Sequence, residues 1–337
     1  MPVRAAIAAP HDLRVTLQGL GTVQATRSVQ VRAQVGGMLT RVLFREGAEV
    51  KKGALLAEID PRPFQAALDA ALAKRAQDAA QRANAERDLA RFRSLAARSF
   101  ASRQQVDTQR SLIAQLTAQI AADRANIEAA RLNLSFTRIT APISGRLGLR
   151  LLDSGNLVTA SGAAPIVTIA EIHPIALVFS LPQQDLPQVM AAMRAGSLAV
   201  DALPAGGGPV LDRGRLVTID NAIDPATGTF RLKASFPNPA DRLWPGQLVT
   251  GQLLLRRLHA VLTVPEAALQ HGPDGLFVYV IGAGGKVARQ AVTVGVEDRG
   301  LAEVRKGLAA GARVVVSGAS RLANGVEVRV EAGAGKA

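Results

Sequence analysis

The sequence predicts a mainly β, elongated, multi-domain fold that is interrupted by an antiparallel α-helical coiled-coil hairpin. Three observations lead to this fold class. A β-type segment repeats at a constant offset, a heptad pattern separates its two copies, and short alternating strands with Gly-rich turns follow toward the C-terminus. We therefore expect a split β-sandwich, a helical insertion and further β domains.

The internal repeat accounts for the split β-sandwich. Residues 31–50 (VRAQVGGMLTRVLFREGAEV) align with residues 139–158 (ITAPISGRLGLRLLDSGNLV) at an offset of 108 residues. Each copy reads as a short strand, a glycine turn, an alternating strand and a second turn with an acidic residue and glycine. The matched turn glycines are Gly37, Gly47, Gly145 and Gly155, where we expect positive φ. Neither half is large enough to bury a core alone, so we expect the two halves to pack face to face.

Between the copies the pattern changes to a helical one. A heptad seam is formed by residues spaced at sevens, namely Val106, Ile113, Ile120, Ile127 and Leu134. An upstream segment, from about 64 to 97, carries small residues spaced seven apart, which we expect to face this seam. They are Ala76, Ala83, Ala90 and Ala97, with Leu72 and Ala79 between them. The pattern predicts two packed helices of roughly 33 residues and about 50 Å each, the second capped by Ser102. Such a hairpin is either a structural spacer or an arm with a binding surface at its tip.

After residue 172 the chain reads as β to its end. Strands are expected over 175–181, 215–220, 229–236 and 248–255, with one short amphipathic helix at 185–194. Shorter strands separated by Gly- and Asp-rich turns begin near residue 258. This pattern indicates a barrel followed by a second small β-unit.

No residue pattern supports chemistry. The chain has no cysteine and four scattered histidines, which excludes disulfides and thiolate metal sites and disfavours a histidine metal site. The Gly206–Gly208 run lacks a Lys-Ser/Thr partner and does not open a helix, so it does not predict a phosphate loop. We expect no catalytic residue, no metal and no cofactor.

The net charge of +13 makes nucleic acid the first partner to consider. With only eleven aromatic residues, the chain has few side chains for stacking on bases. The charge reflects either an Arg-rich composition or attraction to an anionic membrane or polymer surface. We expect no nucleic-acid partner, and steeply salt-dependent DNA binding would contradict this expectation.

The split repeat, the helical hairpin and the β-units that follow occur together in one known family. The chain resembles the periplasmic adaptors, or membrane fusion proteins, of the HlyD-like family that serve resistance-nodulation-division (RND) efflux pumps, most closely the MdtA/AcrA/MexA group. The resemblance covers nearly the whole chain, with these motifs in order: GLGTVQA (19–25), VGGMLTRVLFREGAEVKKGALLAEIDP (35–61), FTRITAPISGRLGLR (136–150), HPIALVFSLPQQDL (173–186), IDNAIDPATGTFRLKASFPN (219–238), LWPGQLV (243–249) and VPEAALQ (264–270).

The resemblance implies four domains. They are a membrane-proximal β domain (1–10 plus 259–337), a β-barrel (11–28 plus 172–258), a lipoyl/biotinyl-like domain in two halves (29–63 plus 137–171) and the α-helical hairpin (64–136). It also implies a non-enzymatic adaptor that links an inner-membrane RND drug/proton antiporter to an outer-membrane channel of TolC type and self-associates as a hexamer.

The family's hairpin-tip pattern, R-x-x-x-L-x-x-x-x-x-x-S, is similar to Arg91, Leu95 and Ser102 of this chain. The resemblance implies that these three residues contact the helices of the outer-membrane channel. An arginine suits carboxylates or carbonyls, a leucine offers an apolar knob, and a serine places a hydroxyl at the bend. The plainer alternative is that Arg91 is a solvated helix residue and Leu95 fills the seam.

Two other functions stay open at this point. One is an adaptor for an ATP-driven (ABC) exporter. The other is a cofactor-carrying lipoyl or biotinyl subunit, because the repeat resembles such carrier domains, although the helical insertion occupies the junction that would hold the cofactor lysine. Lys51 and Lys52 lie in a different turn.

The resemblance also implies a location in the periplasm, peripheral to or anchored in the inner membrane of a Gram-negative bacterium. The sequence contains no run of 18 apolar residues, and its first residues lack the apolar core of a signal peptide. We therefore expect the leader or anchor typical of the family to be absent from this sequence.

Overall fold

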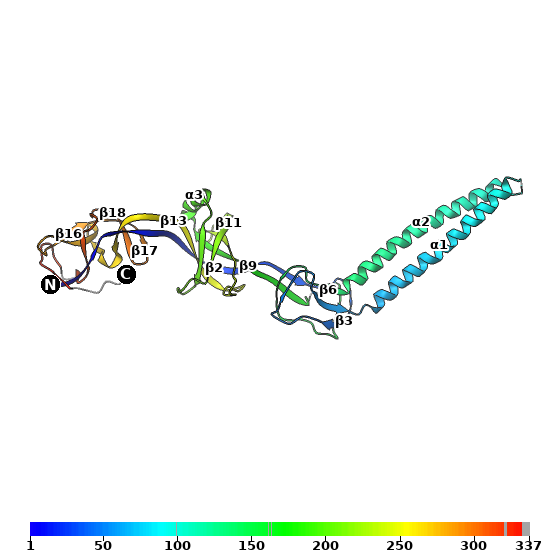
Figure 1. Cartoon of the computed structure of the whole chain (residues 1–337), viewed down its shortest axis with the longest axis horizontal. Helices are drawn as coiled ribbons and strands as arrows, with labels where there is room; N and C mark the ends of the chain where they lie inside the picture. Colours follow the sequence, from blue (N-terminus) through cyan, green and yellow to red (C-terminus); the bar gives the residue numbers. More distant parts are fainter. Residues whose placement is uncertain (99, 161, 163, 320–321, 332–337) are drawn as a thin grey trace. The chain divides into compact units, whose positions relative to one another are not determined.

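The structure is a computed structural model that describes residues 1–98, 100–160, 162, 164–319 and 322–331 (Figure 1). The chain divides into two compact units. One comprises Met1–Gln24 and Pro174–Ala337, and the other comprises Ala25–His173. The mainly β fold with an inserted helical hairpin is confirmed, whereas the four predicted domain boundaries stay a prediction.

The unit Ala25–His173 contains the two halves of the repeat. Its short strands are β3 (Gly37–Val42), β4 (Glu49–Val50), β5 (Leu55–Ile59), β6 (Arg138–Thr140), β7 (Gly145–Leu147) and β8 (Leu157–Val158). Four of them form an antiparallel sheet in the order β6-β5-β3-β8, and β4 pairs with β7. The unit also holds the end of β2 (Ala9–Val31) and the start of β9 (Val167–Pro182).

The two halves exchange strands with an approximate two-fold symmetry. Gly37 of β3 pairs with Val158 of β8, and Val50 of β4 pairs with Gly145 of β7. The repeat offset converts the first pair into the second. Matched positions also share one core, as Leu39 and Leu147 are both buried, at 0% and 2% exposure. The expectation that the two halves pack together is confirmed.

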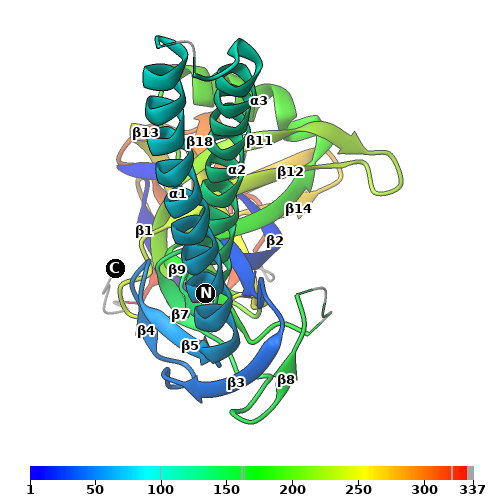
Figure 2. The ribbon, with the colours of Figure 1, turned by 90° about the vertical axis from the view of Figure 1, so that its right-hand side faces the viewer.

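The helical insertion leaves this sheet between β5 and β6. Helix α1 (Arg62–Ala96) and helix α2 (Arg103–Phe136) lie side by side and antiparallel (Figures 1 and 2). Strand β5 pairs directly with β6, so both ends of the hairpin are held by one strand pair. The side-chain amide of Gln109 on α2 donates to the carbonyl oxygen of Ala85 on α1 at 3.2 Å. This bond ties the two helices in one register.

The predicted seam of α2 is confirmed. Val106, Ile120 and Ile127 are buried, and Ile113 and Leu134 are half-buried. The apolar residues at sevens therefore face α1, as the heptad pattern requires.

The predicted seam of α1 is wrong. Ala76, Ala83, Ala90 and Ala97 are exposed, and so are Leu72 and Ala79. The buried residues of α1 are instead Leu68, Asp78, Ala85 and Leu89. Alanines occur on every face of α1, so their positions do not indicate which face is buried. The carboxylate of Asp78 also interrupts the apolar pattern of the face that is buried.

The other unit begins with a closed barrel. Its further elements are η1 (Gln183–Asp185), α3 (Leu186–Ala195), β10 (Ala199–Pro204), β11 (Asp212–Asp224), β12 (Thr229–Phe236) and β13 (Leu248–Pro265). The strand order is β13-β10-β11-β12-β9, and β2 pairs with both β13 and β9, which closes the ring. Phe179, Phe230 and Phe236 fill the core. A Cβ atom at Gly21 would lie 2.4 Å from the Cβ of Phe179, so glycine permits the close approach of β2 to β9.

A small β-unit follows the barrel. Its elements are β1 (Pro2–Ile7), η2 (Glu266–Ala268), β14 (Gln270–Gly272), β15 (Gly275–Ile281), β16 (Val287–Ala291), β17 (Thr293–Asp298), β18 (Leu301–Lys306), β19 (Arg313–Ser317) and β20 (Arg329–Val330). One sheet has the order β14-β15-β19-β1-β20, with β16 beside β15. In its core the Phe277 and Tyr279 rings meet edge to face at 5.3 Å, and the Tyr279 hydroxyl donates to the carbonyl of Leu322 at 2.7 Å.

The strands expected in this unit are present, but two of them are much longer than predicted. Strand β2 has 23 residues and β13 has 18, and they pair from Leu248↔Thr22 to Thr263↔Ala9. This two-stranded ribbon joins the barrel to the terminal β-unit. The register shifts between Leu254 and Arg256 and between Leu258 and Val261, and these irregularities hide the strand period in the sequence. The short helix expected at 185–194 is confirmed as α3.

Candidate functional site

The tip of the hairpin is built from two closed helix ends. At the end of α1, the carbonyl oxygen of Leu95 accepts from the backbone N–H groups of Arg98 and Phe100, at 3.0 and 2.9 Å. At the start of α2, the Ser102 hydroxyl accepts from the Gln105 N–H at 3.2 Å, and the Gln105 side chain accepts from the Ser102 N–H at 3.0 Å. This capping box satisfies two N–H groups that a helix start leaves unpaired. Ser99 lies outside the described residues.

The three predicted tip residues differ in their surroundings. Arg91 lies on α1 with 70% of its side chain exposed, and its Nη2 is 3.2 Å from Asp88 Oδ1. Leu95 is half-buried, and Ser102 is exposed although its hydroxyl caps α2. Arg91 thus keeps donors available to a partner, since one carboxylate oxygen occupies only part of its guanidinium.

The sequence motifs assigned no role to an aromatic residue at the tip. Phe100 is 79% exposed, which is the highest value among the exposed large apolar side chains of the described chain. Its backbone N–H donates to the carbonyl oxygen of Leu95 at 2.9 Å. A phenylalanine at the break in the helical period, in a chain with only nine, is the signal that could have identified it.

The four repeat glycines divide into two kinds. Gly47 and Gly155 lie in turns with φ of 71° and 94° and open space around them, as expected. Gly37 and Gly145 are not turn residues, because they begin strands β3 and β7. A Cβ atom there would lie 2.6 Å from Ile59 Cγ2 or 2.5 Å from the carbonyl oxygen of Ala170. Gly37 excludes a side chain through close packing alone, whereas Gly145 combines close packing with the expected positive φ, at 158°.

Within the described part of the chain, no group of three or more His, Cys, Asp or Glu side chains is arranged to hold a metal ion. Within the same residues, no helix combines the length and the apolar character needed to cross a bilayer.

Comparison with protein families matches three consecutive models. Residues 27–170 match the RND membrane fusion protein barrel-sandwich hybrid domain, residues 174–256 match the β-barrel domain of these proteins, and residues 260–321 match their C-terminal permuted SH3 domain. All three models describe RND adaptors, and none describes an ATP-driven exporter or a cofactor carrier.

Curated relatives align with this chain over 98–100% of its length. The chain is 43% identical over 337 residues to the multidrug resistance protein MdtA of Pantoea ananatis, covering 100% of this chain and 82% of the relative. It is 44% identical to MdtA of Erwinia amylovora, covering 98% and 81%, and 42% identical to MdtA of Escherichia coli, covering 98% and 80%.

Solved structures share the fold. A MacA–MexA chimeric protein containing the Pseudomonas aeruginosa MexA α-hairpin domain aligns with a TM-score of 0.56 at 23% identity, covering 91% of this chain and 98% of that one. MacA from Actinobacillus actinomycetemcomitans aligns with a TM-score of 0.54 at 21% identity, covering 93% and 98%. With its three domain matches and full-length relatives, the chain belongs to the RND membrane fusion proteins, the periplasmic adaptor family of tripartite efflux pumps.

Proposed function

We propose that this chain is a non-enzymatic periplasmic adaptor that links an inner-membrane RND drug/proton antiporter to an outer-membrane channel of TolC type. The barrel and the terminal β-unit dock on the transporter, and the tip of the α1–α2 hairpin contacts the channel. The chain seals the conduit and couples conformational changes, while energy and substrate selection reside in the transporter. It works in the periplasm in association with the inner membrane.

The main support for the proposal is the exposure of two side chains at the tip of the hairpin. Helices of 35 and 34 residues, about 50 Å long, carry two largely exposed side chains at their far end: Arg91 near the end of α1 and Phe100 just after it. Hydrogen bonds at the end of α1 and the start of α2 hold the backbone there. Arginine and aromatic residues are the side chains that most often dominate the binding energy of an interface.

An exchange of charge at the tip tests this assignment. Arg91→Asp should restore drug sensitivity to cells that depend on the pump, because it places a negative charge where the channel is expected to receive a guanidinium. Arg131→Asp is the matched control: Arg131 is 54% exposed and pairs with Glu128 at 2.7 Å, also three residues away on its helix, but it lies near the base of the hairpin. Full resistance with Arg91→Asp at normal protein level would reject the tip assignment.

The apolar tip residues need a separate test. Leu95→Ser and Phe100→Ser should each weaken binding of the purified chain to the purified channel by about tenfold or more. Leu132→Ser is the control, because Leu132 is 54% exposed on α2 away from the tip. Unchanged channel affinity in both tip variants would leave the apolar part of the proposal without support.

The proposed assembly is a hexamer of adaptors. Its support is the exposed face of α1 that carries Ala76, Ala83 and Ala90, because small side chains allow the helix of a neighbour to approach closely. A second support is the cross-strand pair of Met38 and Leu157, which are 45% and 76% exposed.

Sedimentation velocity of the chain, alone and with the solubilised transporter, tests the hexamer. The double variant Ala76→Glu/Ala83→Glu should reduce self-association, because the added carboxylates prevent close helix packing. Ala118→Glu/Ala125→Glu, at exposed positions on α2, measures the effect of charge alone. A wild-type chain that stays monomeric with its transporter would contradict the proposal.

A further inference from the structure

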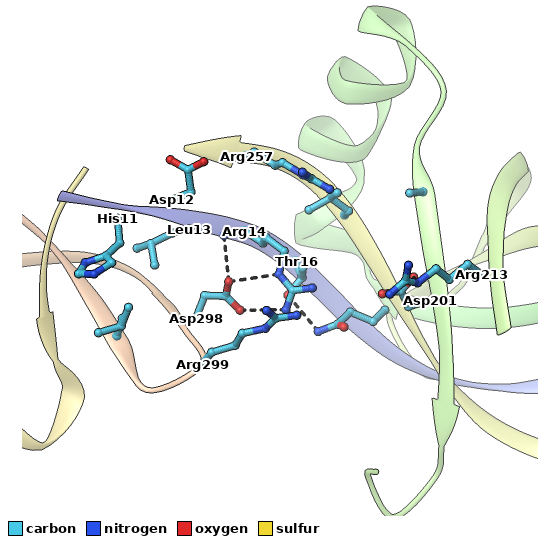
Figure 3. A pocket seen from close by; sticks show the side chains of 14 residues that line it. His11, Asp12, Leu13, Arg14, Thr16, Asp201, Arg213, Arg257, Asp298 and Arg299 are labelled. Carbon is cyan, nitrogen blue, oxygen red and sulfur yellow. Dashed lines mark hydrogen bonds and ion pairs between the residues drawn. The ribbon is translucent and has the colours of Figure 1, made fainter. Parts of the chain in front are cut away.

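A cavity of about 600 Å³ lies beside the ribbon of β2 and β13, where this ribbon meets the turn between β17 and β18 (Figure 3). Four of its lining residues are arginines, namely Arg14, Arg213, Arg257 and Arg299. Three are aspartates, namely Asp12, Asp201 and Asp298. The channel contact proposed at the hairpin tip does not involve this cavity, so its charges require their own explanation.

The charges of this cavity do not cancel within the described chain. Asp298 accepts from the backbone N–H, Nε and Nη2 of Arg14 at 3.1, 3.2 and 3.3 Å. Asp201 lies 3.9 Å from Arg213. Asp12 accepts from the Ala260 N–H at 3.0 Å and lies 3.1 Å from His259 Nδ1.

Two guanidinium groups remain after these pairings. Within the described chain, no ion pair or side-chain hydrogen bond holds Arg257 or Arg299, although Arg257 lies near enough to Asp12, and Arg299 near enough to Asp298, for their charges to attract. Both arginines are exposed along the same cavity. Four arginines and three aspartates leave one net positive charge in the lining, and the unused N–H donors of Arg257 and Arg299 are available to the oxygens of an anion.

Arg257 and Arg299 both occupy positions that are unfavourable for an arginine. Arg257 pairs directly across the ribbon with Arg14, and like charges at directly opposite positions destabilise a strand pair. Arg299 has a φ of 54° and Gly300 a φ of 79°, in the two-residue turn between β17 and β18. Asparagine or glycine suits the Arg299 position far better, so the arginine stands there at a cost in stability.

The remaining walls of the cavity are partly apolar. Leu13, Leu254 and Leu301 line it together with the arginines. A ligand with a compact charged group and a short apolar body would use both kinds of wall. The planar guanidinium fork forms paired hydrogen bonds with phosphate oxygens.

We propose that this cavity binds an organic phosphate, with Arg257 and Arg299 holding the phosphate group and the leucines contacting the attached apolar body. Arg14 is held in place by Asp298, which offsets its charge. A soluble molecule and a lipid headgroup are the two sources of such a phosphate, and both present the same chemistry to the arginines.

Binding of two probes to the full chain tests the site. Titration with phenyl phosphate measures the soluble source, and co-sedimentation with phosphatidylcholine vesicles containing phosphatidic acid measures the lipid source. Arg257→Gln and Arg299→Asn should each weaken the binding of at least one probe by about tenfold. Arg256→Gln is the matched control, because it removes the same charge one residue away and outside the cavity lining.

A stability measurement separates binding from folding. Arg299→Asn should raise the midpoint of thermal unfolding while it weakens phosphate binding, since asparagine tolerates positive φ better than arginine does. A purely structural role of Arg299 would not produce these opposite effects. Equal losses in Arg256→Gln, or unchanged binding of both probes in Arg257→Gln and Arg299→Asn, would overturn the proposal. Neither result depends on the channel contact at the hairpin tip.

Discussion

Helices α1 and α2 pack against each other over almost the same length, and each buries three apolar side chains and one aspartate. The buried apolar residues of α2 are all β-branched, with Ile127 only 2% exposed. In α1, Asp78 is also 2% exposed, and both of its carboxylate oxygens accept from Lys74 Nζ at 2.7 Å. The two seams therefore differ in how their buried aspartates are paired.

The same comparison extends to one residue of α2. Asp123 is 2% exposed, and its Oδ2 has no hydrogen-bond partner within the described chain. Gln119 Nε2 reaches only Oδ1, at 3.5 Å. A buried carboxylate oxygen without a partner lowers stability, so Asp123 is the weak point in an otherwise apolar seam.

The largest expected effect tests the apolar seam. Ile127→Ala should destabilise the hairpin by about 2–4 kcal/mol, because it removes buried methyl groups and leaves a cavity. Leu132→Ala on the same helix, where Leu132 is 54% exposed, should change stability by less than about 1 kcal/mol. Thermal unfolding followed by circular dichroism at the helix band compares the two. Similar losses in both variants would mean that the seam does not hold the hairpin together.

The second prediction concerns the buried carboxylates. Asp123→Leu should stabilise the hairpin by about 1–3 kcal/mol, because an apolar side chain replaces an incompletely paired carboxylate. Asp78→Leu should give a smaller gain, since both oxygens of Asp78 accept from Lys74 at 2.7 Å. Hydrogen exchange of the α2 amides measures both changes. Destabilisation by Asp123→Leu would contradict the description of Asp123 as a weak point.

The third prediction concerns the cap at the start of helix α2. Helix α2 begins with the Ser102–Gln105 capping box, so Ser102→Ala should lower hairpin stability by about 1 kcal/mol. Ser94→Ala is the control, because the Ser94 hydroxyl donates to the Arg91 carbonyl and caps no helix start. Equal stability of the two variants in thermal unfolding would argue against the cap.

The smallest expected effect is a pH dependence at the start of α1. Hydrogen bonds from the Arg62 side chain, and then from its backbone N–H, lower the pKa of Asp60 from 3.8 to about 2. Because the folded-state pKa lies below the unfolded one, this interaction stabilises the fold above about pH 4 and is lost as the pH falls toward about 2. Asp60→Asn should flatten the acid dependence of the helix signal in this window. An unchanged acid profile in Asp60→Asn would remove Asp60 from this role.

The sequence predicted the structure correctly where a position accepts only a few residue types. Isoleucines at sevens identify the seam of α2, and glycines at 47 and 155 identify two turns, because few residue types suit these positions. It failed on α1, where alanine is tolerated on every face and therefore carries no directional signal. It also missed Phe100, whose exposure depends on how the two helix ends close.

The amino-acid sequence by itself determined the order of the domains, the split repeat, the length of the hairpin and the family of the chain. These properties follow from local periodicity and motif order, which are readable without contacts. Only the tertiary structure decided which face of α1 is buried, why Gly37 and Gly145 must be glycines, and where β2 and β13 bring Arg14 and Arg257 together. These features arise from residues distant in the chain, whose proximity no local pattern records.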